Sequence, residues 1–472
     1  MARVSTIITN FRAGEFSPRL EGRIDLQKYN EAAKELTNMV SFPQGGITRR
    51  PGSYYAGTSK DGGKVRLVNF EYSDEQAYVL EFGANYIRFF KDGGILTEAT
   101  TAITAATKAD PVVVTAASHG LSNGDRVYIT NVTGMTQLNN REFTVANKTT
   151  NTFELSGIDG TGFDTYSSGG TVGKIVEVTT TYSATDIFEL NHVQSADVVF
   201  LAHKDHAPAK LTRTTSTSFT LTDVDFIDGP YLDENKGSTT IYASAATGNG
   251  ITLTASASLF TSDHVGAKFR FREVIELEHD QWQASQDIEA NGKRYYNGNV
   301  YQRHATIGVE KSGTNPPVHL EGTVEYNTET GTNSDKIAWI YLHSGFGIVE
   351  ITAVTSGTVA TANVVEDANG NARLPASVVG SSNATKRWSE GAFSAEQGYP
   401  RAVAFYEERL YFAGTEKNPQ SIYGSVSADF ENHTPGTNDD DAINITIASD
   451  RVNVIKHLLP ARFLQILTTS SE

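Results

Sequence analysis

The sequence contains no cysteine, which excludes disulfide bonds and thiolate-bound metals. It has no run of about 18 apolar residues, so no helical membrane span is expected. The opening stretch, MARVSTIITNFRAGEFSPRL, lacks the apolar centre and small-residue cleavage site of a signal peptide. These absences predict a chain that folds in the cytoplasm and is not exported by the standard route.

Basic residues are also scarce. The chain has 39 Lys and Arg against 55 Asp and Glu, a formal charge of −16, and no block of five or six basic residues. Proteins that grip DNA neutralise phosphates with such residues. The composition therefore argues against a surface that holds DNA tightly, but it allows a surface that DNA merely passes.

Strand and turn residues dominate what is present. There are 41 glycines, 20 tyrosines and 23 phenylalanines, and the apolar stretches are short, alternating and bounded by Gly, Asn, Asp or Pro. Residues 24–40 differ, because apolar side chains recur there at spacings of three and four after Asp25, which predicts a helix. The residues at this spacing are Leu26, Tyr29, Ala33, Leu36 and Val40.

A loose repeat runs through the chain. A short aromatic strand, a polar turn and a second strand with Ile or Leu begin near Gln76, Ala196, Pro400 and Pro460. Consecutive hairpins of this kind are typical of β-propeller blades. Unrelated β-hairpins are the alternative interpretation.

Long strand-and-turn inserts separate these hairpins, and each is predicted to be a small β-barrel or sandwich. The predicted fold is therefore all-β, with a propeller-like body, inserted small β-domains and a short N-terminal arm plus helix. The expected parts are an arm and helix for subunit contact (1–60), first blade strands (61–104), a first insert (105–172), a blade (173–235), a second insert (236–390) and further blades (391–472).

Motifs for catalysis or cofactor binding are missing. GTSKDGGK at 57–64 places the P-loop lysine one position late. His203 and His206 flank Asp205 and could form a weak metal site, but a solvated turn between two blade strands fits them better. The sequence predicts no enzyme, no cofactor and no metal site, although a carboxylate pair assembled by folding stays open.

The segment FPQGGITRRPGS, residues 42–53, reads as a rigid extended corner. Gly45 and Gly46 suit a tight turn with positive φ, and Pro51 favours extended backbone at Arg50. Neighbouring side chains on extended backbone point to opposite faces. Arg49 and Arg50 therefore cannot both hold one phosphate, but they can pair with acidic groups on different neighbours.

The N-terminal stretch resembles the opening of the tail nozzle (tail tubular) proteins of short-tailed bacteriophages. YPRAVAFYEERLYFAGTEKNPQSIYGSVSADFENH, near the C-terminus, resembles the same family. ASHGLSNGDRVYITNVTGMTQLNNREFTVANKTTNTFELSG, in the first insert, resembles a small β-domain of phage virion proteins that is named after ubiquitin-activating enzymes. The matching N-terminal residues are Gly14, Glu15, Ser17, Pro18, Leu20, Gly22, Arg23, Asp25, Lys28, Tyr29, Asn38, Pro43, Gly45, Gly46, Arg49, Arg50, Pro51 and Gly52.

This resemblance implies a structural virion protein of the tail, assembled in the host cytoplasm as a homo-oligomeric ring, usually a hexamer. The ring lies below the portal and adaptor proteins, contacts tail fibre, spike or needle proteins, and extends the channel through which duplex DNA leaves without sequence-specific contact. Family members usually continue past the point where this sequence stops, so a propeller here is either incomplete or closed in an unusual way.

Two sets of residues are candidates for this role. Arg23, Arg49 and Arg50 are expected at the contact between subunits. Asp439, Asp440 and Asp441 are expected on a loop facing the channel, with an outward solvated loop as the alternative. A receptor- or glycan-binding tail or spike protein is the alternative function, and a carbohydrate-active propeller enzyme is a third.

Overall fold

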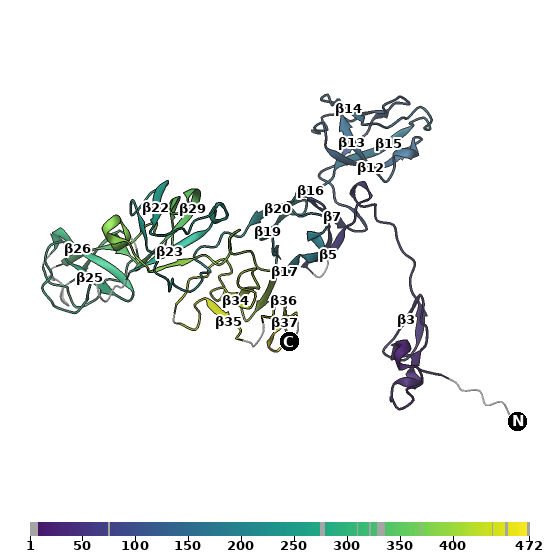
Figure 1. The fold of residues 1–472 in the computed structure, drawn as a ribbon. Helices are drawn as coiled ribbons and strands as arrows, with labels where there is room; N and C mark the ends of the chain where they lie inside the picture. The colour runs from purple at the N-terminus through teal and green to yellow at the C-terminus, as the bar shows by residue number, and fades with distance from the viewer. Residues whose placement is uncertain are drawn as a thin grey trace. The chain divides into compact units, whose positions relative to one another are not determined.

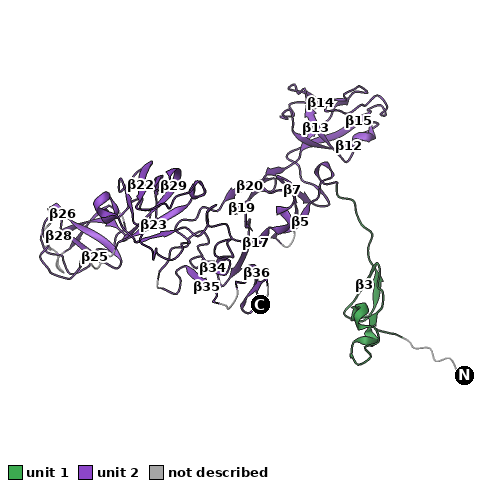
Figure 2. Cartoon of the chain, viewed as in Figure 1, with its two compact units in different colours: residues 1–57 green, residues 58–472 purple. Residues whose placement is uncertain are grey.

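The computed structural model describes residues 8–73, 76–273, 279–308, 310–320, 322–327, 336–368, 370–436, 438–448 and 452–469 (Figure 1). The chain divides into two compact units, residues 1–57 and residues 58–472 (Figure 2). Strands are the main regular elements of both units, which confirms the all-β prediction. In the described part of the chain, no helix is long and apolar enough to cross a membrane.

The first unit, here called the arm, consists of two small strand pairs and two short 3₁₀ turns. Its β3–β4 hairpin turns at Gly45, whose φ is +98° as the sequence predicted, whereas Gly46 has no positive φ. The elements are β1 (Gly14–Glu15), η1 (Pro18–Leu20), η2 (Tyr29–Glu31), β2 (Ala32–Ala33), β3 (Met39–Ser41) and β4 (Ile47–Arg49).

The helix predicted over 24–40 is wrong. That segment contains the 3₁₀ turn η2 and strands β2 and β3 instead. An amphipathic helix of this length is stable only when its apolar face packs on another layer. The arm provides no such layer: Ile24 is 79% exposed, and among residues 8–57 only Gly45 is buried.

The second unit contains three antiparallel sheets that follow one another along the chain like propeller blades. Each of these sheets is built on four main strands. The first joins β5 (Arg66–Ser73), β6 (Gln76–Gly83), β7 (Tyr86–Lys91) and β16 (Glu177–Thr179), with β8 (Gly94–Ile95) beside β7. The second joins β17 (Asn191–Ser195), β18 (Val198–His203), β19 (His206–Thr215) and β20 (Ser218–Asp223). The third joins β32 (Ala402–Tyr406), β33 (Arg409–Ala413), β34 (Ser421–Gly424) and β35 (Ile443–Thr446).

Shared cores connect these sheets in sequence order. Phe89 of the first sheet stacks on Phe219 of the second, and Phe200 of the second contacts Phe405 of the third. Ile455, which begins the β36–β37 pair, joins the core of the third sheet. The repeated hairpins predicted from the sequence are β6–β7, β18–β19 and β32–β33. The last pair is β36 (Ile455–Pro460) and β37 (Leu464–Thr468), so the hairpin predicted to begin near Pro460 begins at Ile455 instead.

The first insert forms a seven-stranded sheet around its own core. The strands are β9 (Thr101–Ala102), β10 (Ala105–Ala106), β11 (Val113–Thr115), β12 (Arg126–Thr133), β13 (Arg141–Ala146), β14 (Thr152–Leu155) and β15 (Ser168–Lys174).

The second insert holds two sheets with separate cores rather than one. The six-stranded sheet contains β21 (Ile241–Ala243), β22 (Ile251–Ala255), β23 (Lys268–Arg272), β29 (Phe346–Ser356), β30 (Val359–Val365) and β31 (Trp388–Glu390). The five-stranded sheet contains β24 (Asp280–Gln281), β25 (Lys293–Tyr296), β26 (Asn299–Gly308), β27 (Thr323–Asn327) and β28 (Lys336–His343). The chain enters the five-stranded sheet after β23 and returns between β28 and β29.

Candidate functional site

The arm exposes most of its apolar side chains. No residue of the arm belongs to a core cluster among the described residues, so the arm has almost no apolar packing of its own. Apolar side chains exposed in this number are available for contact with another protein. The exposed side chains are Ile8, Ile24, Met39, Val40, Phe42, Ile47, Tyr54 and Tyr55.

The three predicted arginines of the arm have different surroundings. Arg23 forms a two-point ion pair with Asp25, at 2.8 and 2.6 Å, and Arg50 donates from Nε to Asn38 Oδ1 at 2.7 Å. Arg49, in β4, makes no side-chain hydrogen bond or ion pair with any residue that the structure describes. Of these three arginines, Arg49 is therefore the one whose charge is available to a partner.

The acidic loop is held by its backbone, which leaves two of its carboxylates exposed. The buried Arg409 donates to the carbonyl oxygens of Asp439 and Asp441, the latter at 2.6 Å. Asp439 and Asp440 are exposed, whereas the Asp441 carboxylate accepts from Asn438 N at 2.7 Å. Arg409, which the sequence did not single out, therefore fixes where this negative charge is presented.

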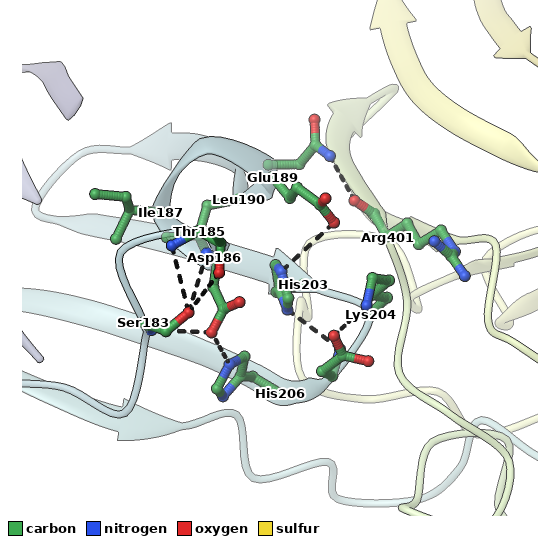
Figure 3. A network of polar contacts seen from close by, with 12 residues as sticks. Ser183, Thr185, Asp186, Ile187, Glu189, Leu190, His203, Lys204, His206 and Arg401 are labelled. Atoms are coloured by element: carbon green, nitrogen blue, oxygen red, sulfur yellow. Dashed lines mark hydrogen bonds and ion pairs between the residues drawn. The ribbon is translucent and has the colours of Figure 1, made fainter. Parts of the chain in front are cut away.

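A polar network lies at the end of the β18–β19 hairpin (Figure 3). His206 contacts Asp186 Oδ2 through Nε2 at 3.0 Å and the Thr181 hydroxyl through Nδ1 at 3.2 Å. Burial opposes ionisation of Asp186, but hydrogen bonds from Ser183 and His206 lower its pKa overall. Hydroxyl, imidazole and carboxylate in series can hold and relay a proton.

The segment AHKDHAP forms the expected turn. Its side chains His203, Asp205 and His206 do not converge as ligands of one metal ion would. The backbone N–H of Asp205 donates to His203 Nδ1 at 3.2 Å, while His206 turns to Asp186. Two neighbouring cavities of about 590 and 430 Å³ open beside this hairpin, and Ala207, Asp223 and Tyr399 line both. An aromatic ring beside carboxylates is a combination able to bind a sugar.

Among the described residues, the cluster with metal-ligand composition is a different one: Glu273, His279 and His343. Nε2 of His279 lies 3.3 Å from Glu273 Oε1, and Nε2 of His343 lies 3.3 Å from Glu273 Oε2. Burial, with the nearby His279, lowers the pKa of His343 to about 3, so its imidazole is neutral at pH 7. The sequence showed no sign of this cluster, because His343 lies more than sixty positions beyond Glu273 and His279 and the three residues share no motif.

An ion-pair network joins the first insert to the first blade. Arg88 of β7 has a fully buried side chain that forms two hydrogen bonds to Glu142 of β13, at 2.7 and 2.8 Å, and one to Glu177 of β16, at 2.8 Å. Glu177 also binds Lys60 at 2.6 Å. Burial acts to lower the pKa of Arg88, but its two glutamate partners raise it overall, so the guanidinium stays charged.

Comparison with known proteins identifies one segment. Residues 109–175 match the family described as the ubiquitin-activating enzyme E1 FCCH domain, so the first insert is similar to that small β-domain, as its sequence predicted. No curated protein matches the chain.

Proposed function

We propose that the chain is a structural subunit of the tail nozzle of a short-tailed bacteriophage, and that it assembles into a homo-oligomeric ring, with six copies expected. The observation that carries the proposal is the arm, which has an apolar surface and no core of its own. Such a segment gains most of its stabilisation from a partner. The FCCH-like insert and the blade-like sheets are compatible with this role.

Charge favours a second copy of the chain as the partner of the arm. Residues 1–57 carry eight basic and five acidic residues, a net +3, whereas the remaining 415 residues carry 31 basic and 50 acidic residues, a net −19. Opposite charges attract the arm of one subunit to the body of the next. Contacts of this head-to-tail kind close into a ring when the rotation between subunits is right.

The acidic body also suits a channel that duplex DNA passes. A strongly basic lining would bind phosphates through counterion release and slow the DNA, whereas an acidic or neutral one lets it slide. Asp439 and Asp440 are proposed to face the lumen because their carboxylates are exposed while their loop is fixed by Arg409.

Electron microscopy of the native particle tests the role directly. The expected result is a closed ring of this chain on the tail axis, with a negative or neutral potential along its channel. A peripheral location, or a continuous positive lining, would contradict the proposal. So would sub-micromolar binding of duplex DNA by the isolated ring at physiological salt.

The cavities beside β18–β19 favour a second candidate function, a receptor- or glycan-binding tail protein. Tyr399 and Asp223 line both cavities and would provide a stacking ring and a hydrogen-bond acceptor for a sugar. A glycan array probed with wild type and Tyr399→Ala tests it, with Tyr406→Ala as the control outside the cavities. Binding lost only in the Tyr399 variant would establish this function, and cleavage of the glycan would establish an enzyme instead.

A further inference from the structure

The polar cluster between the two sheets of the second insert is placed where it could fasten them together. Glu273 directly follows β23, His279 directly precedes β24, and His343 ends β28 just before β29. The chain leaves the six-stranded sheet at the first two residues and returns to it at the third. All three side chains thus lie at the junction between the two sheets.

The two sheets have separate cores. The six-stranded sheet packs around one core and the five-stranded sheet around another, and no buried residue belongs to both core clusters. Each sheet is therefore stabilised internally, so their relative orientation depends on contacts at the junction.

The donor atoms have the composition and spacing of a metal site. In a tetrahedral zinc site with bonds of about 2.0–2.1 Å, neighbouring ligand atoms lie about 3.3–3.4 Å apart. Nε2 of His279 lies 3.3 Å from Oε1 of Glu273 and Nε2 of His343 lies 3.3 Å from Oε2, so each nitrogen has this spacing to a different carboxylate oxygen. One ligand atom from each of the three residues lies within 4.8 Å of the others. Two imidazoles and one carboxylate suit Zn²⁺ and similar divalent transition metals.

Burial strengthens this assignment. The side chains of Glu273, His279 and His343 are 3%, 9% and 6% exposed, and Oε2 of Glu273 has no hydrogen-bond donor among the described residues. A buried carboxylate oxygen without a donor is costly, and a cation between the three side chains would remove that cost. We propose that Glu273, His279 and His343 bind one Zn²⁺ ion that holds the five-stranded sheet to the six-stranded sheet.

Binding also requires a local change at His343. The N–H of Gly345 donates to His343 Nδ1 at 3.1 Å, so in the metal-free chain the ring proton of the neutral imidazole lies on Nε2, which is 3.3 Å from Glu273 Oε2 but forms no hydrogen bond to it. Coordination through Nε2 moves this proton to Nδ1, and the Gly345 amide then turns away. Zn²⁺ binding thus has to displace the hydrogen bond from Gly345 to His343.

The test uses the full chain, purified with a chelator and then titrated with Zn²⁺ or Co²⁺. The expected results are about one bound Zn²⁺ per chain, a visible absorption band of near-tetrahedral Co²⁺, and a rise in melting temperature that EDTA reverses. Trp282 and Trp339 belong to the core of the five-stranded sheet, so tryptophan fluorescence reports on this part of the molecule.

Glu273→Gln and His343→Gln should each lower Zn²⁺ affinity at least tenfold, while His304→Gln, on β26 of the same sheet, should bind like wild type. If a variant fails to fold, the stoichiometry, the Co²⁺ band and the EDTA effect on wild type still decide the question. Less than a tenth of an equivalent of Zn²⁺ in wild type, or equal binding by folded Glu273→Gln, would overturn the proposal. The zinc-site proposal does not depend on the proposed nozzle role, and each can fail without the other.

Discussion

His433 illustrates how one buried side chain can make the stability of the body depend on pH. It is 2% exposed and lies against the rings of Phe226 and Phe412. Burial lowers its pKa to about 3, whereas an imidazole in the unfolded chain titrates near about 6.5. Between these values the unfolded chain binds more protons, so stability present above about pH 6.5 is lost as the pH falls toward about 3.

His433→Phe should remove this part of the acid sensitivity. From about pH 6.5 to about pH 5, His433 accounts for a loss of about 2 kcal/mol in the free energy of unfolding, on the order of 1.4 kcal/mol per pH unit. Urea unfolding of wild type and variant at both pH values measures the difference. His304→Phe, at a half-exposed position, is the control, and an unchanged pH slope in His433→Phe would refute the expectation.

At the scale of elements, Arg88 connects the FCCH-like insert to the first blade. Arg88→Met would leave Glu142 and Glu177 close together without their shared cation. Removing one partner of a buried ion pair costs about 3–5 kcal/mol. The variant should therefore unfold at lower denaturant concentration, and protease should release the insert faster than in wild type.

Arg126→Met is the matched control for this experiment. Arg126 also contacts Glu142, at 3.3 Å, but its side chain is 27% exposed, so its loss should cost about 1 kcal/mol or less. Equal effects of the two substitutions would show that the buried guanidinium has no special part in the joint. Deleting the insert would remove Glu142 and leave the buried Arg88 with Glu177 as its partner. The deletion should therefore be better tolerated when Arg88 is replaced as well.

At the scale of the whole molecule, the arm is expected to decide assembly. Arg49→Glu should weaken ring formation at least tenfold, because it reverses an arginine whose side chain has no described partner and which we propose faces an acidic body. Circular dichroism should stay unchanged, since no core cluster contains an arm residue. Native mass spectrometry and incorporation into particles measure the effect.

Lys148→Glu makes the same charge change on an exposed residue of the insert and serves as the control. Arg50→Glu should also loosen the β3–β4 hairpin, because it removes the bond to Asn38. Normal incorporation of Arg49→Glu would show that this arginine is not at the interface.

The residue pattern alone was enough to predict the strands and hairpins of the body. Alternation of apolar and polar side chains is a local property with a period of two, and it sets which face of a strand is buried. The β6–β7, β18–β19 and β32–β33 hairpins and the strand-and-turn character of the first insert were predictable for this reason. The turn at Gly45 was predictable because its positive φ favours glycine.

Packing between distant segments decided the rest. The spacing in 24–40 favoured a helix, but a helical pattern gives a helix only where another layer covers its apolar face, and the arm has none. The second insert divides into two cores because β23 pairs with β29 and β31, while β26 pairs with β28, which no local pattern specifies. The same pairings bring Glu273 and His279 to His343, and they place the Arg88 guanidinium against Glu142 and Glu177. Those contacts join residues more than fifty positions apart, so only the tertiary structure could create the candidate metal site and the joint of the FCCH-like insert.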